Sequence, residues 1–158
     1  MSAARILEGE SSARGRRVAI VAAKFNDFIV ASLLKGATAA WLERGGPAED
    51  LLVARVPGAF ELPVAARRLA LSGRYDAVVA LGCVIRGDTP HFEHVAGECA
   101  RGLQLTSLET GVPVIFGVLT VETVEQALER AATTAGNKGG EAMAAALEMA
   151  SLMARLAG

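Results

Sequence analysis

The stretch from Asp76 to His94, DAVVALGCVIRGDTPHFEH, decides the fold expected for this chain. Its first part, residues 77–85, is apolar and rich in β-branched residues, which is typical of a strand buried on both faces of a parallel sheet. The run breaks at residues 86–90, RGDTP, where the glycine permits a tight turn. Asp88 or Thr89 suits a helix N-cap, and the proline suits the first helical turn. The pattern predicts a strand, a turn and a helix N-terminus. Together these suit an anion such as phosphate, and an ordinary turn between strand and helix explains the residues equally well.

The same alternation of strand and helix patterns runs along the rest of the chain. Strands are predicted at 18–24, 51–56, 77–85 and 112–121, and helices at 28–44, 60–71, 90–109, from 123 to about 133–137, and 138–156. Connections of a few residues join them, so the helices between two strands cross over between parallel strands. Asn26 or Asp27 is expected to cap the helix at 28–44. We therefore predict an α/β fold in one domain, residues 1–158. It is a three-layer α/β/α sandwich with a central four-stranded parallel sheet, of the flavodoxin-like type.

Residues 1–16 form an N-terminal arm before the first predicted strand. The arm is polar apart from Ile6 and Leu7, and a short strand is expected near residues 5–9. We expect this segment to dock on a neighbouring subunit, where it could add a strand to the sheet.

The composition limits the function classes. Of the 158 residues 52% are hydrophobic, and the mean hydropathy is +0.37, which predicts an alanine-rich interior and apolar subunit interfaces. The net charge of −1 argues against nucleic acid as a partner. The longest apolar runs are shorter than the ~18 residues of a membrane span, and no signal peptide is visible, so a cytoplasmic protein without a membrane partner is expected. Cys83 and Cys99 form no ligand-like pair and suit a reducing compartment.

Two histidines and a cysteine are candidates for chemistry near the turn. His91 could act as a general acid or base, or it could be a helix-start histidine bonded to a nearby acid. His94 lies three residues further on and could form half of a metal site, but no clear third ligand follows, so no metal is expected. Cys83 could be a nucleophile beside His91, although a buried core residue is the favoured interpretation.

Aromatic and charged residues near the other strand ends are candidates for ligand binding. Phe25, Phe60 and Phe116 lie on or near the edge where parallel strands bind ligands, and could stack on a flat heterocycle, although core packing explains any one of them. Glu61 could accept hydrogen bonds from ligand hydroxyls or serve a helix dipole. Arg130, late in its helix, favours the dipole without any function, and Lys138 has a similar status.

Five sequence blocks together resemble one family. They are Phe25-Asn26, PGAFELP (57–63), GCVIRGDTPHFEHV (82–95), GVPVIFGVLT (111–120), and QALERA (126–131) with AGNKGGEA (135–142). In this order they are similar to the 6,7-dimethyl-8-ribityllumazine synthases of riboflavin biosynthesis. The resemblance implies a condensation of 5-amino-6-(D-ribitylamino)uracil with 3,4-dihydroxy-2-butanone 4-phosphate, with release of phosphate and water. It implies no metal and no redox cofactor.

The resemblance also implies a role for each matching residue. Phe25, with Asn26 beside it, would stack on the pyrimidine, Phe116 would cover it, and Cys83, Val84 and Ile85 would line it through backbone and apolar contacts. Ala59, Phe60 and Glu61 would hold the ribityl chain. Asp88, Thr89 and Arg130 would bind the phosphate, with Lys138 nearby, and His91 would transfer protons.

The family resemblance further implies a homopentamer whose sites form between subunits, and in some members a shell of twelve pentamers. Residues 133–138 show no insertion, which favours the 60-subunit shell, although Ala132 and Thr134 depart from the usual GTKAGN pattern. Two alternatives stay open: a weakly active or non-catalytic paralogue that binds flavin or lumazine in a shell, and the related pentameric enzyme that forms riboflavin. The presence of Thr89, His91 and Arg130 favours the synthase.

Overall fold

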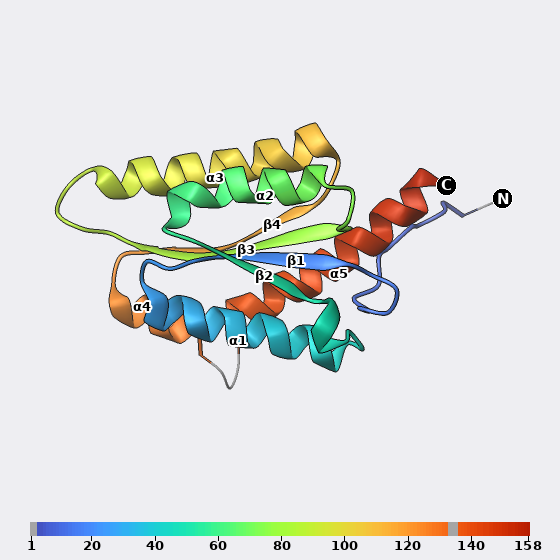
Figure 1. Cartoon of the computed structure of the whole chain (residues 1–158), viewed down its shortest axis with the longest axis horizontal. Coiled ribbons are helices and arrows are strands. Elements are labelled where there is room, and N and C mark those ends of the chain that lie inside the picture. Colours follow the sequence, from blue (N-terminus) through green and yellow to red (C-terminus); the bar gives the residue numbers. More distant parts are fainter. Residues whose placement is uncertain (1–2, 133–135) are drawn as a thin grey trace.

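The computed structural model describes residues 3–132 and 136–158 and shows three layers (Figure 1). Its elements in chain order are β1 (Val18–Ala23), α1 (Asp27–Glu43), β2 (Leu52–Val56), α2 (Leu62–Leu71), β3 (Ala77–Ile85), α3 (His91–Thr110), β4 (Val114–Val121), α4 (Val124–Arg130) and α5 (Lys138–Ala157). Helices α2 and α3 cover one face of the sheet, and α1, α4 and α5 cover the other. The predicted α/β sandwich is confirmed. Among the described helices, none is long and apolar enough to cross a membrane.

The sheet has four parallel strands in the order β2-β1-β3-β4. The two central strands are buried: all of β1, and all of β3 except its last residue, Ile85. The ends of β1 and β2 are in register, because Ala23 pairs with Val56, and so are the ends of β3 and β4, because Ile85 pairs with Val121. Strand β3 runs on past the end of β1, since Leu81 already pairs with Ala22. The carboxyl ends of the strands therefore open onto one edge, which is where parallel sheets bind ligands.

Two hydrophobic clusters, one on each face of the sheet, hold the layers together. Alanine and glycine let the helices approach closely, as the alanine-rich composition predicted. A Cβ at Gly139 would collide with the backbone carbonyl of Leu33, so α5 rests directly on α1 at this point. Trp41 is the largest fully buried side chain, and its Nε1 donates to the carbonyl of Pro47 at 2.7 Å.

Most expected element boundaries agree with the structure to within one or two residues, but one helix ends earlier than expected. The helix expected from residue 60 begins as a 3-10 turn, Ala59–Glu61, and becomes α2 at Leu62. Helix α4 ends at Arg130, earlier than the expected end near residues 133–137, and the N–H of its C-cap, Ala131, bonds back to the carbonyl of Ala127 at 3.0 Å. The expected continuation partly falls on residues 133–135, which lie outside the described residues.

The arm contains no strand in residues 3–17, contrary to the expectation for residues 5–9. Instead it lies along α5 of the same chain. A Cβ at Gly9 would collide with the backbone carbonyl of Glu148, and Glu10 pairs with Arg155 at 3.0 Å. A lone extended segment has no strand partner within one chain, so the docking of this arm on a neighbour stays a prediction.

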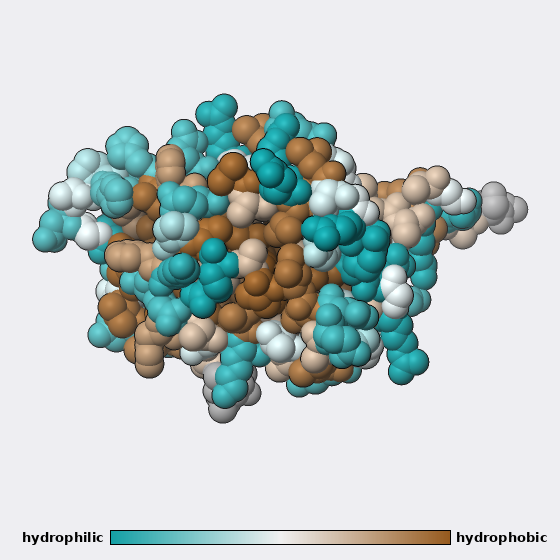
Figure 2. Space-filling model, in the orientation of Figure 1, coloured by the Kyte–Doolittle hydropathy of each residue, from teal (hydrophilic) through white to brown (hydrophobic). Residues whose placement is uncertain are grey.

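The edge strand β2 leaves apolar surface uncovered. Figure 2 shows hydrophobic side chains gathered in the middle of one face, where the edge of the sheet emerges between the two helix layers. Leu52 and Val53 of β2 are both partly exposed there. An open edge of this kind offers backbone groups and apolar side chains to another chain.

Candidate active site

A cleft of about 710 Å³ opens at the carboxyl ends of β1, β2 and β3. We call it the His91 cleft. Ten of the residues predicted for the site line it: Phe25, Asn26, Ala59, Phe60, Glu61, Cys83, Val84, Ile85, Thr89 and His91. They come from three separate loops, which the parallel register brings to one edge of the sheet.

The turn between β1 and α1 carries Phe25 and Asn26. Asn26 adopts a left-handed conformation, with φ of 61°, which asparagine tolerates better than most residues. It occupies the N-cap position of α1, one of the two positions expected for the cap, but its side chain makes no capping bond. Instead its Nδ2 donates to the backbone carbonyl of Cys83 at 2.8 Å, which ties the turn to the end of β3. The N–H of Phe25 bonds to the carbonyl of Pro57 at 2.9 Å, and the phenyl ring is 71% exposed. The backbone of Phe25 is therefore held by a hydrogen bond, whereas its ring is exposed to solvent.

The loop after β2 places a carboxylate opposite that ring. A Cβ at Gly58 would lie 3.3 Å from Glu61 Oε1 and 4.0 Å from the Cβ of Phe25. The missing side chain of Gly58 therefore leaves space between the aromatic ring and the carboxylate. The N–H of Glu61 bonds to the carbonyl of Gly58 at 3.1 Å, which closes the 3-10 turn and holds the acid over the cleft.

The end of β3 provides an apolar floor. Cys83 is buried, and burial raises the pKa of its thiol to about 11. The thiolate is the reactive form of cysteine, so this thiol is inert near neutral pH, as the core interpretation predicted. Its backbone carbonyl has a structural role, since it accepts the bond from Asn26.

The first turn of α3 contributes a polar wall. Pro90 occupies the N-cap position, and the hydroxyl of Thr89 accepts a long bond of 3.4 Å from the N–H of His91. The predicted cap is therefore wrong for both Asp88 and Thr89, because Pro90 takes the N-cap position, and Asp88 does not line the cleft either. His91 and His94 both line it, but among the described residues no three metal-ligating side chains gather closely enough to hold an ion.

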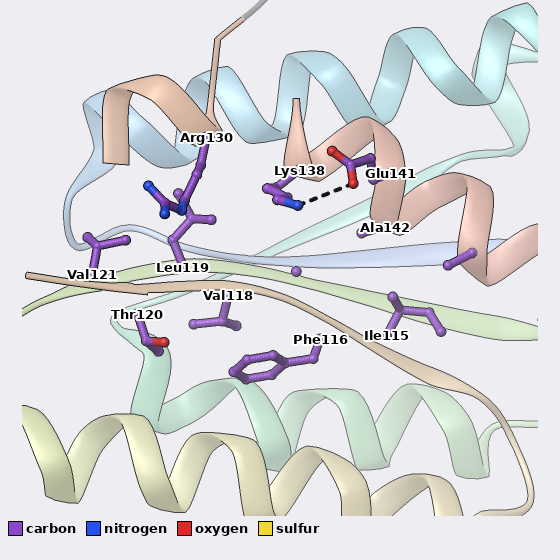
Figure 3. A pocket seen from close by; sticks show the side chains of 12 residues that line it. Ile115, Phe116, Val118, Leu119, Thr120, Val121, Arg130, Lys138, Glu141 and Ala142 are labelled. Atoms are coloured by element: carbon purple, nitrogen blue, oxygen red, sulfur yellow. Dashed lines mark hydrogen bonds and ion pairs between the residues drawn. The ribbon is translucent and has the colours of Figure 1, made fainter. Parts of the chain in front are cut away.

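Three other predicted residues, Phe116, Arg130 and Lys138, line a second, separate cleft of about 520 Å³ along β4, which we call the β4 cleft. Figure 3 shows Arg130 of α4 with Lys138 and Glu141 of α5 on one side of the strand, and Phe116 pointing to the opposite side. Lys138 pairs with Glu141 at 3.3 Å, and Arg130 Nη1 donates to the carbonyl of Gln126 at 3.0 Å. Thr123 and Gln126 form a capping box that fixes the start of α4.

One chain therefore divides the predicted residues between two clefts. Phe116, Arg130 and Lys138 lie apart from His91, and each cleft is open to solvent. The sequence reasoning missed two aromatic or basic residues of the His91 cleft, Phe92 and His94, as lining residues. Both belong to the GCVIRGDTPHFEHV block (82–95), so their place in this block was the signal that could have indicated them as lining residues.

The comparison with protein families gives one match. Residues 15–154 match the family of 6,7-dimethyl-8-ribityllumazine synthase, which leaves only residues 1–14 and 155–158 unmatched. The match contains every residue of both clefts. By this match and by its fold, the chain belongs to the 6,7-dimethyl-8-ribityllumazine synthase family, whose transferase-type enzymes act on small molecules in riboflavin biosynthesis and form oligomers.

Proposed function

We propose that the protein condenses 5-amino-6-(D-ribitylamino)uracil with 3,4-dihydroxy-2-butanone 4-phosphate to 6,7-dimethyl-8-ribityllumazine. The 5-amino nitrogen bonds to the ketone carbon and one water leaves. Loss of the proton at C3 and of phosphate from C4 then leaves an enol, which tautomerises to a new carbonyl at C3. Attack of the ribitylamino nitrogen on this carbonyl expels a second water. The His91 cleft carries this proposal, because it combines aromatic faces, a carboxylate, a helix N-terminus and a histidine in about 710 Å³.

The apolar part of the cleft suits the pyrimidine. The exposed ring of Phe25 offers a flat face to the heterocycle. Val84 and Ile85, with the backbone of Cys83, form the floor beneath it. Glu61, held beside Gly58, accepts hydrogen bonds from ribityl hydroxyls along the wall made by Ala59 and Phe60.

The polar part suits the phosphate substrate. The turn at residues 87–89 and the free N–H groups of α3 attract the phosphate, and the Thr89 hydroxyl is close enough to join them. The role of Asp88 in phosphate binding rests on the family resemblance alone. His91 lies in the same helical turn and moves protons between the reacting amine, the substrate carbon and water.

We infer that the two clefts are halves of one site that is completed between subunits of a homopentamer. Phe116 and Arg130, with Lys138 nearby, would then come from the neighbouring chain to cover the pyrimidine and neutralise the phosphate. Exposed apolar residues support association, since Phe28 is 77% and Phe116 45% exposed. The arm would add a strand to the open β2 edge of a neighbour. A shell of twelve such rings is also part of this proposal. The turn on which it depends, residues 133–138, includes residues 133–135, which lie outside the described residues.

Mixing the two substrates with the protein tests the reaction. Lumazine fluorescence and phosphate should appear together in a 1:1 ratio. A flavin-binding paralogue would instead bind lumazine without phosphate release, and the riboflavin-forming enzyme would consume lumazine. Either result would contradict the proposal. Light scattering should give a mass that is a multiple of five chains, and an active monomer would refute the shared site.

A further inference from the structure

Arg86 occupies the junction between the two clefts, although it lines neither of them. It is the first residue after β3, and its N–H bonds to the carbonyl of Val121 at the end of β4 at 2.9 Å. Its backbone therefore continues the pairing of the two strands. From this fixed point the side chain reaches out over the loops.

The guanidinium of Arg86 contacts three side chains at once. Nη1 bonds to Glu93 Oε1 and Nε bonds to Glu122 Oε2, both at 2.7 Å. Cζ lies 4.5 Å from the centre of the Phe92 ring, a distance typical of a cation–π contact. The hydrogen bonds that Arg86 donates to Glu93 and Glu122 raise the pKa of the guanidinium further above its usual range. An arginine can make these contacts together because its fork is planar and carries several separated donors.

Each of these partners belongs to a segment that matters for the site. Phe92 and Glu93 lie in the first turn of α3 beside His91, and Phe92 itself lines the His91 cleft. Glu122 lies at the corner between β4 and α4, next to the Thr123 cap of the helix that carries Arg130. Neither glutamate lines a cleft. The contacts of Arg86 thus join the turn that carries His91 to the corner that leads to Arg130.

We propose that Arg86 is a positioning residue that fixes the first turn of α3, and with it His91 and the phosphate-binding turn, against the β4–α4 corner. This inference rests on the proposed function. The loop at residues 86–90 has few other ties. Within residues 3–132 and 136–158, the other hydrogen bonds of this loop are the 3.4 Å bond that the Thr89 hydroxyl accepts from His91 and the bonds that the Pro90 carbonyl accepts from the N–H groups of Glu93 and His94. Small displacements of reacting groups are costly in catalysis, so a loose turn should slow the reaction.

A direct role in phosphate binding is the competing explanation, and it predicts the opposite effect at Glu122. If Arg86 only supplied charge, removing the neighbouring carboxylate would free the cation and lower the KM for the butanone phosphate. If Arg86 positions the turn, the same change breaks one of its anchors, lowers kcat and raises that KM. Glu122→Gln therefore separates the two explanations, because one predicts a lower KM for the butanone phosphate and the other a higher KM.

Steady-state kinetics of Arg86→Gln, Arg86→Lys and Glu122→Gln test the proposal. We expect Arg86→Gln to lower kcat about five- to tenfold and to raise the KM for the butanone phosphate, because two exposed ion pairs and one cation–π contact are lost. The KM for the pyrimidine should stay within about twofold, since its pocket is built on other loops. Arg86→Lys should not restore kcat, because an ammonium cannot span both carboxylates and stack on Phe92. Full rescue by lysine, or a lowered KM in Glu122→Gln, would overturn the proposal.

Arg67→Gln is the matched control. It removes an ion pair of the same kind, from Arg67 to Glu109 at 2.6 Å, between α2 and α3 and away from both clefts. The control should keep the wild-type kinetics. Each variant should form an oligomer with the same number of subunits as the wild type, measured by light scattering.

Hydrogen exchange gives a readout that needs no activity. Amides of residues 94–99, which bond back into the first turns of α3, should exchange faster in Arg86→Gln and Glu122→Gln than in wild type and Arg67→Gln. If the wild type makes no lumazine, the proposed function fails, and exchange alone decides whether Arg86 holds the turn. Wild-type exchange in Arg86→Gln would overturn the proposal whatever the kinetics.

Discussion

Subunit complementation tests the shared site directly. His91 and Arg130 line different clefts of one chain, so a site built between subunits takes His91 from one chain and Arg130 from its neighbour. His91→Ala and Arg130→Ala should each be nearly inactive alone. Mixed oligomers of the two variants should regain activity, because some interfaces combine an intact histidine with an intact arginine.

The expected magnitudes follow from the chemistry of each cleft. Loss of a general acid–base group slows a reaction about 10²- to 10⁴-fold. Loss of a charge-assisted bond to phosphate costs about 1.5–3 kcal/mol, or roughly 10- to 100-fold in kcat/KM for the butanone phosphate alone. In a random 1:1 mixture each half of a site is intact with probability one half, so about one quarter of the wild-type activity should return.

The assay is lumazine formation at a low concentration of butanone phosphate, after the two variants are co-expressed so that subunits mix. A double variant mixed 1:1 with wild type is the control, and its activity also depends on where the site lies. A site between subunits predicts about one quarter of the wild-type activity in this mixture, whereas a site within one chain predicts about one half. No gain when the single variants mix, together with half activity in the control, would refute the shared site.

Three further predictions concern the reaction and the core. His91→Ala should slow lumazine formation strongly while binding of the pyrimidine survives in a calorimetric titration; an unchanged rate would remove His91 from the mechanism. Gly139→Ala should lower the free energy of unfolding by about 1–3 kcal/mol, measured in urea, since its methyl group would overlap the Leu33 carbonyl; wild-type stability would contradict the close contact of α1 and α5. Burial raises the pKa of Cys83 and Cys99 from 9.0 to about 11, so the unfolded chain loses these protons first and stability should fall between pH 9 and 11 but not below pH 9; a variant with both cysteines changed to alanine should show a shallower fall, and an identical pH dependence would refute this origin.

Much of the fold could be predicted from local patterns. The apolar run at residues 77–85 indicated a doubly buried strand, and β3 occupies those residues in the centre of the sheet. Thr123 was expected to begin a helix, and it caps α4 through its bond with Gln126. Such features depend on side chains a few residues apart, so sequence spacing is sufficient to predict them.

The candidate site was predictable only in part. The motif blocks named residues that gather in one cleft, but a side-chain function assumed locally was wrong at Asn26. Its side chain bonds to the carbonyl of Cys83, 57 residues away, and makes no cap on the adjacent helix. Sequence spacing gives no information on a hydrogen-bond partner as far along the chain as Cys83 is from Asn26.

The sequence by itself determined the alternation of strands and helices, the buried centre of the sheet and the group of residues suited to the chemistry. Tertiary structure alone decided the strand order β2-β1-β3-β4, the path of the arm along α5 and the division of the site residues between two clefts. It also revealed Arg86, whose partners Glu93 and Glu122 lie on different elements. The physical reason is the range of the interactions: propensity and periodicity act within a turn or a strand, whereas packing and ion pairs join segments whose separation in sequence says nothing of their distance in space.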